Sequence, residues 1–379
     1  MQAVPHTRLN QNKRAVFLAS NPSLDVHGPV GHRFEAAASL AHNLTQAKAA
    51  GVTLHMQAGG NMVNAARSAQ KNGRAPVSLI TLRGPTPVLP HDVFGEALAS
   101  DALSPVVIPV SGHSHRTLYY EDGSTAYARG SEHLIISPDS HDFIAQRLQA
   151  MLSGATLLGI DNLPNNDVLP LYAVLQRTAK EVDVPIFVDA KGLCLQRVLK
   201  NIRDGVGAPL IGLKQNLEEF SSLTNLAAGE LGALLASGEL EKFAQIILPK
   251  ARELTETYLD PDRGIFILTT GPHPWYAFMG HHVFRLTPPK LTAISPVGSG
   301  DSLVGYLMAR LAENGELTAS DLVQATAISA ATATLPGSQI ATITEATTFF
   351  PKVGILELSQ QSRDRQSEPN EFRHVPGLF

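Results

Sequence analysis

Short apolar runs recur along the chain and alternate with longer stretches of helical spacing. Continuous apolar runs that are separated by helices are typical of parallel strands buried on both faces. The pattern therefore predicts an α/β fold with a mostly parallel central sheet between two helical layers. The runs that carry this prediction are residues 16–19, 77–81, 156–160, 186–188, 210–213 and 265–269.

Residues 106–136 depart from this pattern, because polar and apolar positions alternate there without helical spacing. Within this stretch, residues 117–120 and 124–128 flank a turn sequence that ends in Gly123, which predicts a β-hairpin. We expect the hairpin to combine with residues 26–57 into a small β-sheet lid beside the main sheet.

Charged and polar residues accumulate at the C-terminal end of the chain. We therefore expect one large domain over residues 15–345 and a C-terminal extension over residues 346–379 that lies on the surface. Within the large domain, polar side chains follow the ends of several predicted strands, Asp161 and Asp189 among them. Ligands of mostly parallel sheets bind beyond the carboxyl ends of the strands, so we expect the site at that edge.

Composition narrows the classes of protein that fit. The chain has 379 residues, 44% hydrophobic and 17% charged, which is typical of a soluble globular protein. A net charge of −4 and a pI of about 6.4 predict no nucleic-acid partner. No apolar run approaches the roughly 18 to 20 residues of a membrane span, which predicts no membrane partner. Cys194 is the only cysteine, which excludes an internal disulfide and favours a cytoplasmic location.

Residues 296–302 carry the strongest chemical signal. Gly298 and Gly300 flank a small residue, Asp301 follows, and an amphipathic helix begins at once. A glycine turn and a helix N-terminus both present N–H groups that suit a phosphate. An aspartate at that position is able to take a proton from an attacking hydroxyl, so the stretch has the parts for phosphoryl transfer to an alcohol. The alternative is a tight turn with Asp301 as an ordinary first-turn helix residue.

Two further motifs offer groups for binding a sugar and a magnesium ion. Gly59-Gly60 leads into a predicted helix, and Asn64 on that helix offers an amide to sugar hydroxyls; the alternative is a plain loop-to-helix junction. Asn216 and Glu219 share one helix face, where their oxygens are able to hold a hydrated magnesium ion near nucleotide phosphates. The alternative for this pair is simple helix capping.

In this order along the chain, the motifs resemble those of the ribokinase-like (PfkB) carbohydrate kinases. The resemblance is nearest to the branch of 1-phosphofructokinase and tagatose-6-phosphate kinase and spans roughly residues 15–340. It implies a three-layer α/β/α fold with a β lid, a homodimer formed through that lid, and transfer of the γ-phosphate of ATP with Mg²⁺ to a sugar or sugar phosphate. The landmarks are Asn21-Pro22-Ser23-Leu24-Asp25, Gly59-Gly60 with Asn64, Lys214-x-Asn216-x-x-Glu219, and Gly298-Ser299-Gly300-Asp301.

The resemblance also implies roles for individual residues. Asp301 would be the catalytic base, with the backbone of Gly298, Ser299 and Gly300 as an anion hole. Asn216 and Glu219 would organise Mg²⁺. The sugar would be held by Asp25, Gly59, Gly60, Asn64 and Arg116, and the nucleotide would lie along Lys214, Thr270 and Gly271.

One departure leaves the substrate open. The phosphosugar branch has a lysine where this chain has Asn61, and a lysine ammonium is an ordinary way to bind a phosphate. Arg116, Arg67 or Arg83 could supply the missing charge. The runner-up is therefore a kinase of an unphosphorylated sugar or a nucleoside. A third hypothesis is a non-catalytic sensor that binds sugar or nucleotide, although an intact Asp301 favours catalysis.

Overall fold

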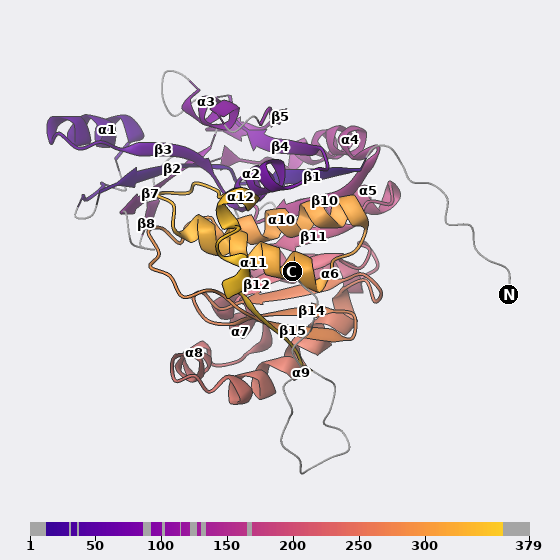
Figure 1. The fold of residues 1–379 in the computed structure, drawn as a ribbon. Coiled ribbons are helices and arrows are strands. Elements are labelled where there is room, and N and C mark those ends of the chain that lie inside the picture. The colour runs from indigo at the N-terminus through magenta and orange to yellow at the C-terminus, as the bar shows by residue number, and fades with distance from the viewer. Residues whose placement is uncertain are drawn as a thin grey trace, which may run out of the picture.

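A computed structural model describes residues 13–29, 32–35, 38–85, 92–100, 103–113, 115–121, 127–129, 134–164 and 169–358. Within these ranges, a ten-stranded sheet forms the centre of the molecule and a four-stranded sheet projects to one side of it (Figure 1). The expected α/β fold, with a mostly parallel sheet and a smaller second sheet, is confirmed.

The large sheet is parallel over most of its width. Its strand order is β16-β15-β14-β13-β12-β11-β10-β1-β4-β5, and the strands from β13 to β5 run parallel to one another. These strands are β13 (Ile265–Thr269), β12 (Gly212–Asn216), β11 (Ile186–Asp189), β10 (Ala155–Asp161), β1 (Arg14–Ala19), β4 (Val77–Arg83) and β5 (Val106–Pro109). Three antiparallel strands complete one side: β14 (Trp275–Met279), β15 (His282–Thr287) and β16 (Gly354–Glu357).

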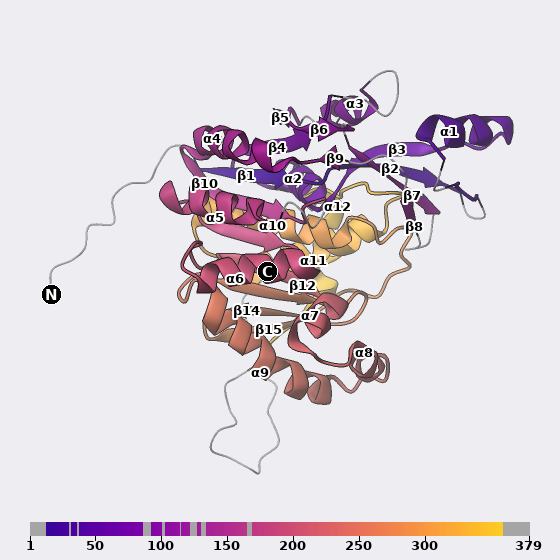
Figure 2. The same cartoon turned by 180° about the vertical axis from the view of Figure 1, so that it is seen from behind.

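Two layers of helices cover the sheet, and Figures 1 and 2 show its opposite faces. One face is covered by α2 (Asn61–Asn72), α10 (Ser299–Asn314) and α11 (Ala319–Ala333), with the short helix α12 (Ile343–Ala346) beside them. The other is covered by α4 (His141–Leu152), α5 (Leu171–Glu181), α6 (Gly192–Arg203), α7 (Leu217–Thr224) and α9 (Leu240–Tyr258), with α8 (Ala228–Ala236) packed on α9.

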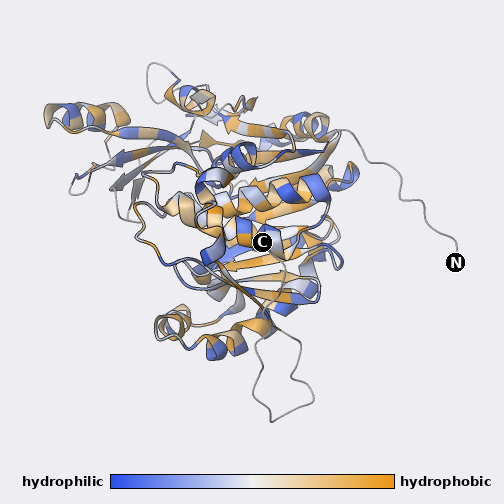
Figure 3. Cartoon of the chain, in the orientation of Figure 1, coloured by the Kyte–Doolittle hydropathy of each residue, from blue (hydrophilic) through white to orange (hydrophobic). Residues whose placement is uncertain are grey.

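Burial on both faces explains the continuous apolar runs. Along β1, Phe17 belongs to the core beneath α2 and α10, whereas Val16 and Leu18 belong to the core beneath α4 and α5. Each residue of such a strand removes apolar surface from water on one face or the other. Figure 3 shows the hydrophobic residues concentrated in the sheet and on the inner sides of the helices.

The smaller sheet has the strand order β3-β2-β7-β8. Its strands are β2 (Ser23–Gly28), β3 (His55–Gly59), β7 (Arg116–Glu121) and β8 (Tyr127–Arg129). The antiparallel pair β7 and β8 forms the expected hairpin, whose turn lies outside the described residues. One face of β2 packs Leu24 and Val26 into a local core with Leu40 of α1 (Leu40–Ala49) and Val93 of α3 (Val93–Ser100), so Asp25 and His27 project from the opposite face.

Three details differ from the sequence-based expectations. Residues 106–109, expected in the lid, form the edge strand β5 of the large sheet, because a short β-branched run fits either sheet equally well. Residues 40–49, within the other expected lid segment, form helix α1. Within the expected C-terminal extension, residues 354–357 form β16, which pairs with β15 at the opposite edge of the large sheet; residues 359–379 lie outside the described ones.

None of the helices among the described residues combines the length and the apolar character that a membrane crossing requires. The remaining short elements among the described residues are a two-stranded sheet of β6 (Ser111–Gly112) with β9 (Leu134–Ile135), and 3₁₀ turns at Pro138–Ser140 and Phe350–Lys352.

Helices α2 and α10 are in very close contact, and Gly305 makes that contact possible. A Cβ at Gly305 would lie 2.0 Å from the carbonyl oxygen of Ala65 on α2, so any side chain there forces the two helices apart. Ser68 on α2 also donates a hydrogen bond to the carbonyl oxygen of Ser302, at 2.7 Å. The two helices that carry the diglycine and Gly-x-Gly-Asp motifs are therefore held in one relative position.

We expect Gly305→Ala to lower the free energy of unfolding by about 3 kcal/mol, at the upper end of the usual cost of overpacking. Gly232→Ala is the matched control, because Gly232 also lies inside a helix but a Cβ there would meet nothing within 4 Å. The control should be neutral or slightly stabilising, since alanine has the higher helix propensity. Urea denaturation of both variants measures the difference, and equal stabilities would contradict the proposed role of the contact.

Candidate active site

Charged side chains gather at the carboxyl ends of the central strands. Asp161 ends β10 and Asp189 ends β11, and the two residues are direct neighbours across the parallel pair. Lys214 lies in the adjacent strand β12, rather than after it as the apolar run had indicated. The buried strand accommodates this lysine because its ammonium is paired with Asp189, as described below.

Helix α10 begins at this edge and turns its N-terminus toward these groups. Its N-cap is Gly298, whose backbone φ of 80° lies in the left-handed region that favours glycine. The N–H and the hydroxyl of Ser299 both donate back to the carbonyl oxygen of Pro296, at 3.3 and 2.8 Å. Helix geometry leaves the N–H groups of Gly300 and Asp301 without an intrahelical acceptor. Two backbone donors and the positive end of the helix dipole are therefore available to an anion.

Asp301 stands in the first turn of α10 and is largely surrounded by protein. Its Oδ2 accepts a hydrogen bond from Nδ2 of Asn64 on α2, at 2.9 Å. Burial raises the pKa of Asp301 to about 7, and the carboxylate of Asp189 adds to the rise, whereas Lys214 and the Asn64 bond oppose it. A carboxyl group with a pKa near neutrality is suited to accept and release a proton.

Lys214 and Asp189 form a buried ion pair beside Asp301. Lys214 Nζ lies 3.1 Å from Asp189 Oδ1 and 3.4 Å from Oδ2. Burial alone would lower the pKa of Lys214, but the carboxylates of Asp189, Glu219 and Asp301 outweigh it and raise that pKa above its usual value. A Cβ at Gly300 would lie 3.8 Å from Lys214 Nζ, so this permanent cation lies against the start of α10.

Asp25 enters the site from the smaller sheet. Its Oδ1 accepts a hydrogen bond from the Ser23 hydroxyl at 2.8 Å, and a Cβ at Gly59 would lie 2.1 Å from its Oδ2. Only glycine at position 59 lets the carboxylate stand against the diglycine strand, and Gly60 then begins α2 with a φ of 103°. Burial raises the pKa of Asp25, while the Ser23 bond and the charge of Arg116 lower it, which places Arg116 near the same carboxylate.

Asn216 and Glu219 form a capping box at the start of α7. Asn216 Oδ1 accepts from the N–H of Glu219, and Glu219 Oε2 accepts from the N–H of Asn216, both at 2.9 Å. The capping alternative is thus present in the structure. Glu219 Oε1 remains outside the box, 3.9 Å from Lys191 Nζ. One carboxylate oxygen with an amide oxygen suits Mg²⁺, which keeps several waters and binds few protein oxygens.

The remaining predicted residues lie at the same edge. Thr270 and Gly271 follow β13, one strand further along than Lys214. The Thr270 hydroxyl lies 3.0 and 2.8 Å from the carbonyl oxygens of His273 and Pro274, so it stabilises its own loop. A Cβ at Gly271 would meet nothing within 4 Å, which leaves its backbone open to a ligand. Among the residues that the model covers, no three His, Cys, Asp or Glu side chains are grouped as a metal site.

Two of the arginines considered as phosphate ligands are engaged elsewhere. Arg83 pairs with Asp92 at 2.5 Å and lies over the ring of Phe94. Arg67 is buried and donates to Asn64 and to backbone carbonyls. Of the three arginines, Arg116 is the one whose charge acts on Asp25 and Asp161 together.

Sequence reasoning assigned no role to Asp189 and Asp161, although both directly follow apolar runs, which was the available signal. Asp189 holds Lys214 in place. Asp161 accepts hydrogen bonds from the Ser20 hydroxyl at 2.6 Å and from the Met62 N–H at 3.4 Å, and burial raises its pKa to about 6. Asp161 therefore links the end of β1 to the first turn of α2.

The fold and this edge together define a ribokinase-like protein. A sequence profile of the pfkB family of carbohydrate kinases matches residues 35–345. The chain therefore belongs to the pfkB family, and it is an ATP-dependent carbohydrate kinase, as the motifs predicted.

Individual relatives agree with this assignment. ATP-dependent 6-phosphofructokinase isozyme 2 of Escherichia coli (strain K12) is 24% identical over 267 residues, which are 68% of this chain and 76% of that protein. The crystal structure of Escherichia coli phosphofructokinase-2 in complex with potassium has a TM-score of 0.67 at 18% identity and covers 89% of this chain and 98% of its own. A possible 1-phosphofructokinase from Thermotoga maritima has a TM-score of 0.68 at 13% identity, with 91% and 100% covered. These two structures support the fold.

The raised pKa of Asp301 predicts a pH-dependent cost in stability. The folded state holds this proton more tightly than the unfolded chain, whose aspartate pKa is near 3.8. Stability is therefore lost as the pH rises from about 4 to 7 and stays lost above 7. We expect Asp301→Asn to be more stable than the wild type, and the gain to be about 2 kcal/mol larger at pH 8 than at pH 5.

Urea denaturation at both pH values measures this gain. Asp262→Asn is the control, because Asp262 is an exposed turn residue. A gain that is equal at pH 5 and pH 8, or larger at pH 5, would contradict the burial of an ionised Asp301.

Proposed function

We propose that the chain transfers the γ-phosphate of ATP to a hydroxyl group of a sugar or sugar phosphate, with Asp301 as the general base. The observation that supports this most is the position of Asp301, in the first turn of a glycine-led helix and between Asn64 and Lys214. The carboxylate takes the proton of the attacking sugar hydroxyl. The oxygen of that hydroxyl bonds to the γ-phosphorus while the bond from the γ-phosphorus to ADP breaks. Charge on the transferred group is stabilised by the backbone donors that Gly298, Ser299 and Gly300 position at the start of α10.

The nucleotide lies in this proposal along Lys214, Thr270 and Gly271. Lys214 supplies a fixed positive charge, and its ion pair with Asp189 holds it in position. Asn216 and Glu219 would hold Mg²⁺, which would neutralise charge on the phosphates. Asp25 accepts hydrogen bonds from the sugar, while Gly59 and Gly60 let the sugar approach the backbone. Asn64, which donates to Asp301, and Arg116, whose charge acts on Asp25, complete the sugar site.

The proposal also includes a homodimer that forms through the smaller sheet, in a reducing cytoplasm. Strands β3 and β8 are the edges of that sheet, and an unpaired edge is able to pair with a second copy. The charge balance and the absence of a long apolar helix among the described residues agree with a small-molecule enzyme.

Asp301→Asn should lower kcat by at least about 10³-fold while ATP and sugar still bind, because the amide cannot take the proton. In the wild type, kcat should fall about tenfold per pH unit below pH 7, where Asp301 becomes protonated. Coupled ADP release from pH 5 to 9 and calorimetric ATP binding measure both quantities. Binding without turnover in the wild type would instead support a sensor.

Asn61 favours a second candidate, a kinase of an unphosphorylated sugar or nucleoside. Asn61 is the first residue of α2 and carries no charge, and Arg116 is the one of the three arginines whose charge acts on Asp25 and Asp161 together, which makes it the candidate for a second phosphate. With a panel of fructose 1-phosphate, fructose 6-phosphate, tagatose 6-phosphate and free hexoses at fixed ATP, we expect free sugars to have the higher kcat/KM.

Asn61→Lys should then raise kcat/KM for the sugar phosphates by about tenfold, because an ammonium is added where their phosphate binds. Asn61→Gln is the matched control and should leave the preference unchanged. A clear preference of the wild type for one sugar phosphate would eliminate the second candidate.

A further inference from the structure

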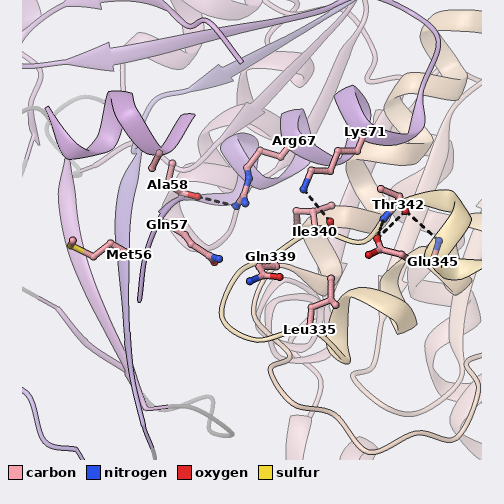
Figure 4. Close-up of a pocket in the computed structure, with 11 residues that line it drawn as sticks. Met56, Gln57, Ala58, Arg67, Lys71, Leu335, Gln339, Ile340, Thr342 and Glu345 are labelled. Atoms are coloured by element: carbon pink, nitrogen blue, oxygen red, sulfur yellow. Dashed lines mark hydrogen bonds between the residues drawn. The ribbon is translucent and has the colours of Figure 1, made fainter. Parts of the chain in front are cut away.

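Arg67 is connected to Asp301 through Asn64, which hydrogen-bonds to both residues. Arg67 lies three residues after Asn64 on α2 and is 3% exposed. Its Nη1 lies 3.1 Å from the carbonyl oxygen of Ala58, 2.9 Å from that of Ser338 and 3.3 Å from Oδ1 of Asn64. Figure 4 shows the side chain extending from α2 toward Ala58 at the end of β3.

These bonds decide how the Asn64 amide is turned. A guanidinium only donates hydrogen bonds, so the Asn64 atom that faces Arg67 has to be the oxygen. The NH₂ group of the same amide then faces Asp301, where it donates to Oδ2. With the opposite orientation, the amide oxygen would stand against the carboxylate of Asp301 and its NH₂ against the guanidinium, which are both repulsive.

We propose that Arg67 is a positioning residue for the base: it holds the Asn64 amide in the orientation that donates to Asp301. This inference rests on the proposed role of Asp301 as the base. Arg67 acts through Asn64, and it is not proposed to touch the sugar or the nucleotide.

The same guanidinium fixes its own position through two segments that are far apart in the sequence. Ala58 belongs to β3, and Ser338 to the segment between α11 and α12. Gln57 strengthens this junction, because its Oε1 accepts from the N–H and the hydroxyl of Ser338 at 2.7 and 2.9 Å. Arg67 therefore has a fixed position without any help from a ligand.

A cavity of about 400 Å³ lies beside this junction and is shown in Figure 4. Its lining includes Arg67, Lys71, Gln57, Gln339 and Glu345. Water in such a polar cavity is able to replace a truncated Arg67. Water both donates and accepts, so it would no longer select one orientation of Asn64. Replacement of Arg67 by an apolar side chain should therefore release the amide without leaving an unsolvated hole.

The charged groups that act on Asp301 come from every neighbouring element. Asp189 at the end of β11 and Asp25 on β2 raise its pKa, and Lys214 on β12 lowers it. The charge of Arg67 also lowers the pKa of Asp25, so a change at position 67 reaches Asp301 by that route as well. A change in the titration of Asp301 would thus report on the Asn64 bond together with the effect of the guanidinium charge, both direct and through Asp25.

The kinetic test compares Arg67→Met with Arg67→Lys. Loss of the amide orientation should lower kcat by about 10- to 100-fold, because small misplacements at a reacting centre have effects of that size. It should also raise the apparent pKa of the acid limb in the plot of kcat against pH by about one unit, while KM for ATP changes less than about twofold. Arg67→Lys keeps a donor toward Asn64 and should recover most of kcat with the wild-type limb.

Lys71→Met is the matched control for charge. Lys71 lies one turn further along α2, lines the same cavity and donates to the carbonyl oxygen of Ile340. It should leave both kcat and the limb unchanged. A lower kcat with an unshifted limb in Arg67→Met, or Arg67→Lys as impaired as Arg67→Met at equal thermal stability, would overturn the proposal.

A second measurement needs no turnover, and so separates this proposal from the proposed function. Carboxyl ¹³C NMR of aspartate-labelled protein without substrates follows Asp301, identified by its absence in Asp301→Asn. Arg67→Met should raise its apparent pKa by about one unit. In an Asn64→Leu background the same substitution should add less than about 0.3 units, because the amide that transmits the effect is gone.

This double-mutant comparison, Arg67→Met with and without Asn64→Leu, has two other outcomes. An equal shift in both backgrounds means that Arg67 acts by its charge alone, which overturns the inference whether or not the protein is a kinase. A shift confined to the background with Asn64, in a protein that never turns over, keeps the positioning role of Arg67 and rejects the assignment of Asp301 as a working base.

Discussion

The contact between α2 and α10 is the constraint on which the rest of the site depends. Gly305 lets the backbones approach so closely that no side chain fits between Gly305 and the Ala65 carbonyl oxygen. One turn before Gly305 on α10, Asp301 meets Asn64, the residue just before Ala65 on α2, at 2.9 Å. A change of one ångström in the spacing of the helices would break that hydrogen bond, because such bonds weaken steeply outside a narrow range of distance. The packing of the hydrophobic layer thus sets the geometry of the polar edge.

The edge itself is unfavourable for stability and favourable for proton transfer. Asp25, Asp161 and Asp301 all have raised pKa values, with burial as the largest cause for each. Lys214 and Arg116 offset part of this negative charge. An isolated surface aspartate would be ionised at all physiological pH values and would be a weak base. Burial makes Asp301 a stronger base at the expense of stability, as is common at active sites.

The motif glycines that mark the pfkB family are backbone features, whereas the departure of this chain from the phosphosugar branch at Asn61 is a side-chain feature. The glycine positions on which the motifs rely are present, including the left-handed Gly298 and the close approach of Asp25 to Gly59. The departure at Asn61 concerns one charge at the start of α2, which changes what the site is able to bind without changing the fold. Substrate choice in such a site depends on a few side chains, so the family by itself assigns the class of reaction more firmly than the sugar.

The sequence by itself determined the layers, the motifs and the residues at the edge. Apolar runs predicted the parallel strands because burial on both faces leaves a continuous signal, and Gly298 and Asp301 stood out because turns and helix starts are local. Tertiary structure alone decided which sheet took residues 106–109, that residues 354–357 closed the far edge, and that Lys214 lay inside a strand paired with Asp189. It also decided that Arg67 donates a hydrogen bond to Asn64. The strand and ion-pair choices depend on partners more than twenty residues away in the sequence, and the last depends on the position of the buried Arg67 guanidinium. No local pattern of residues contains that information.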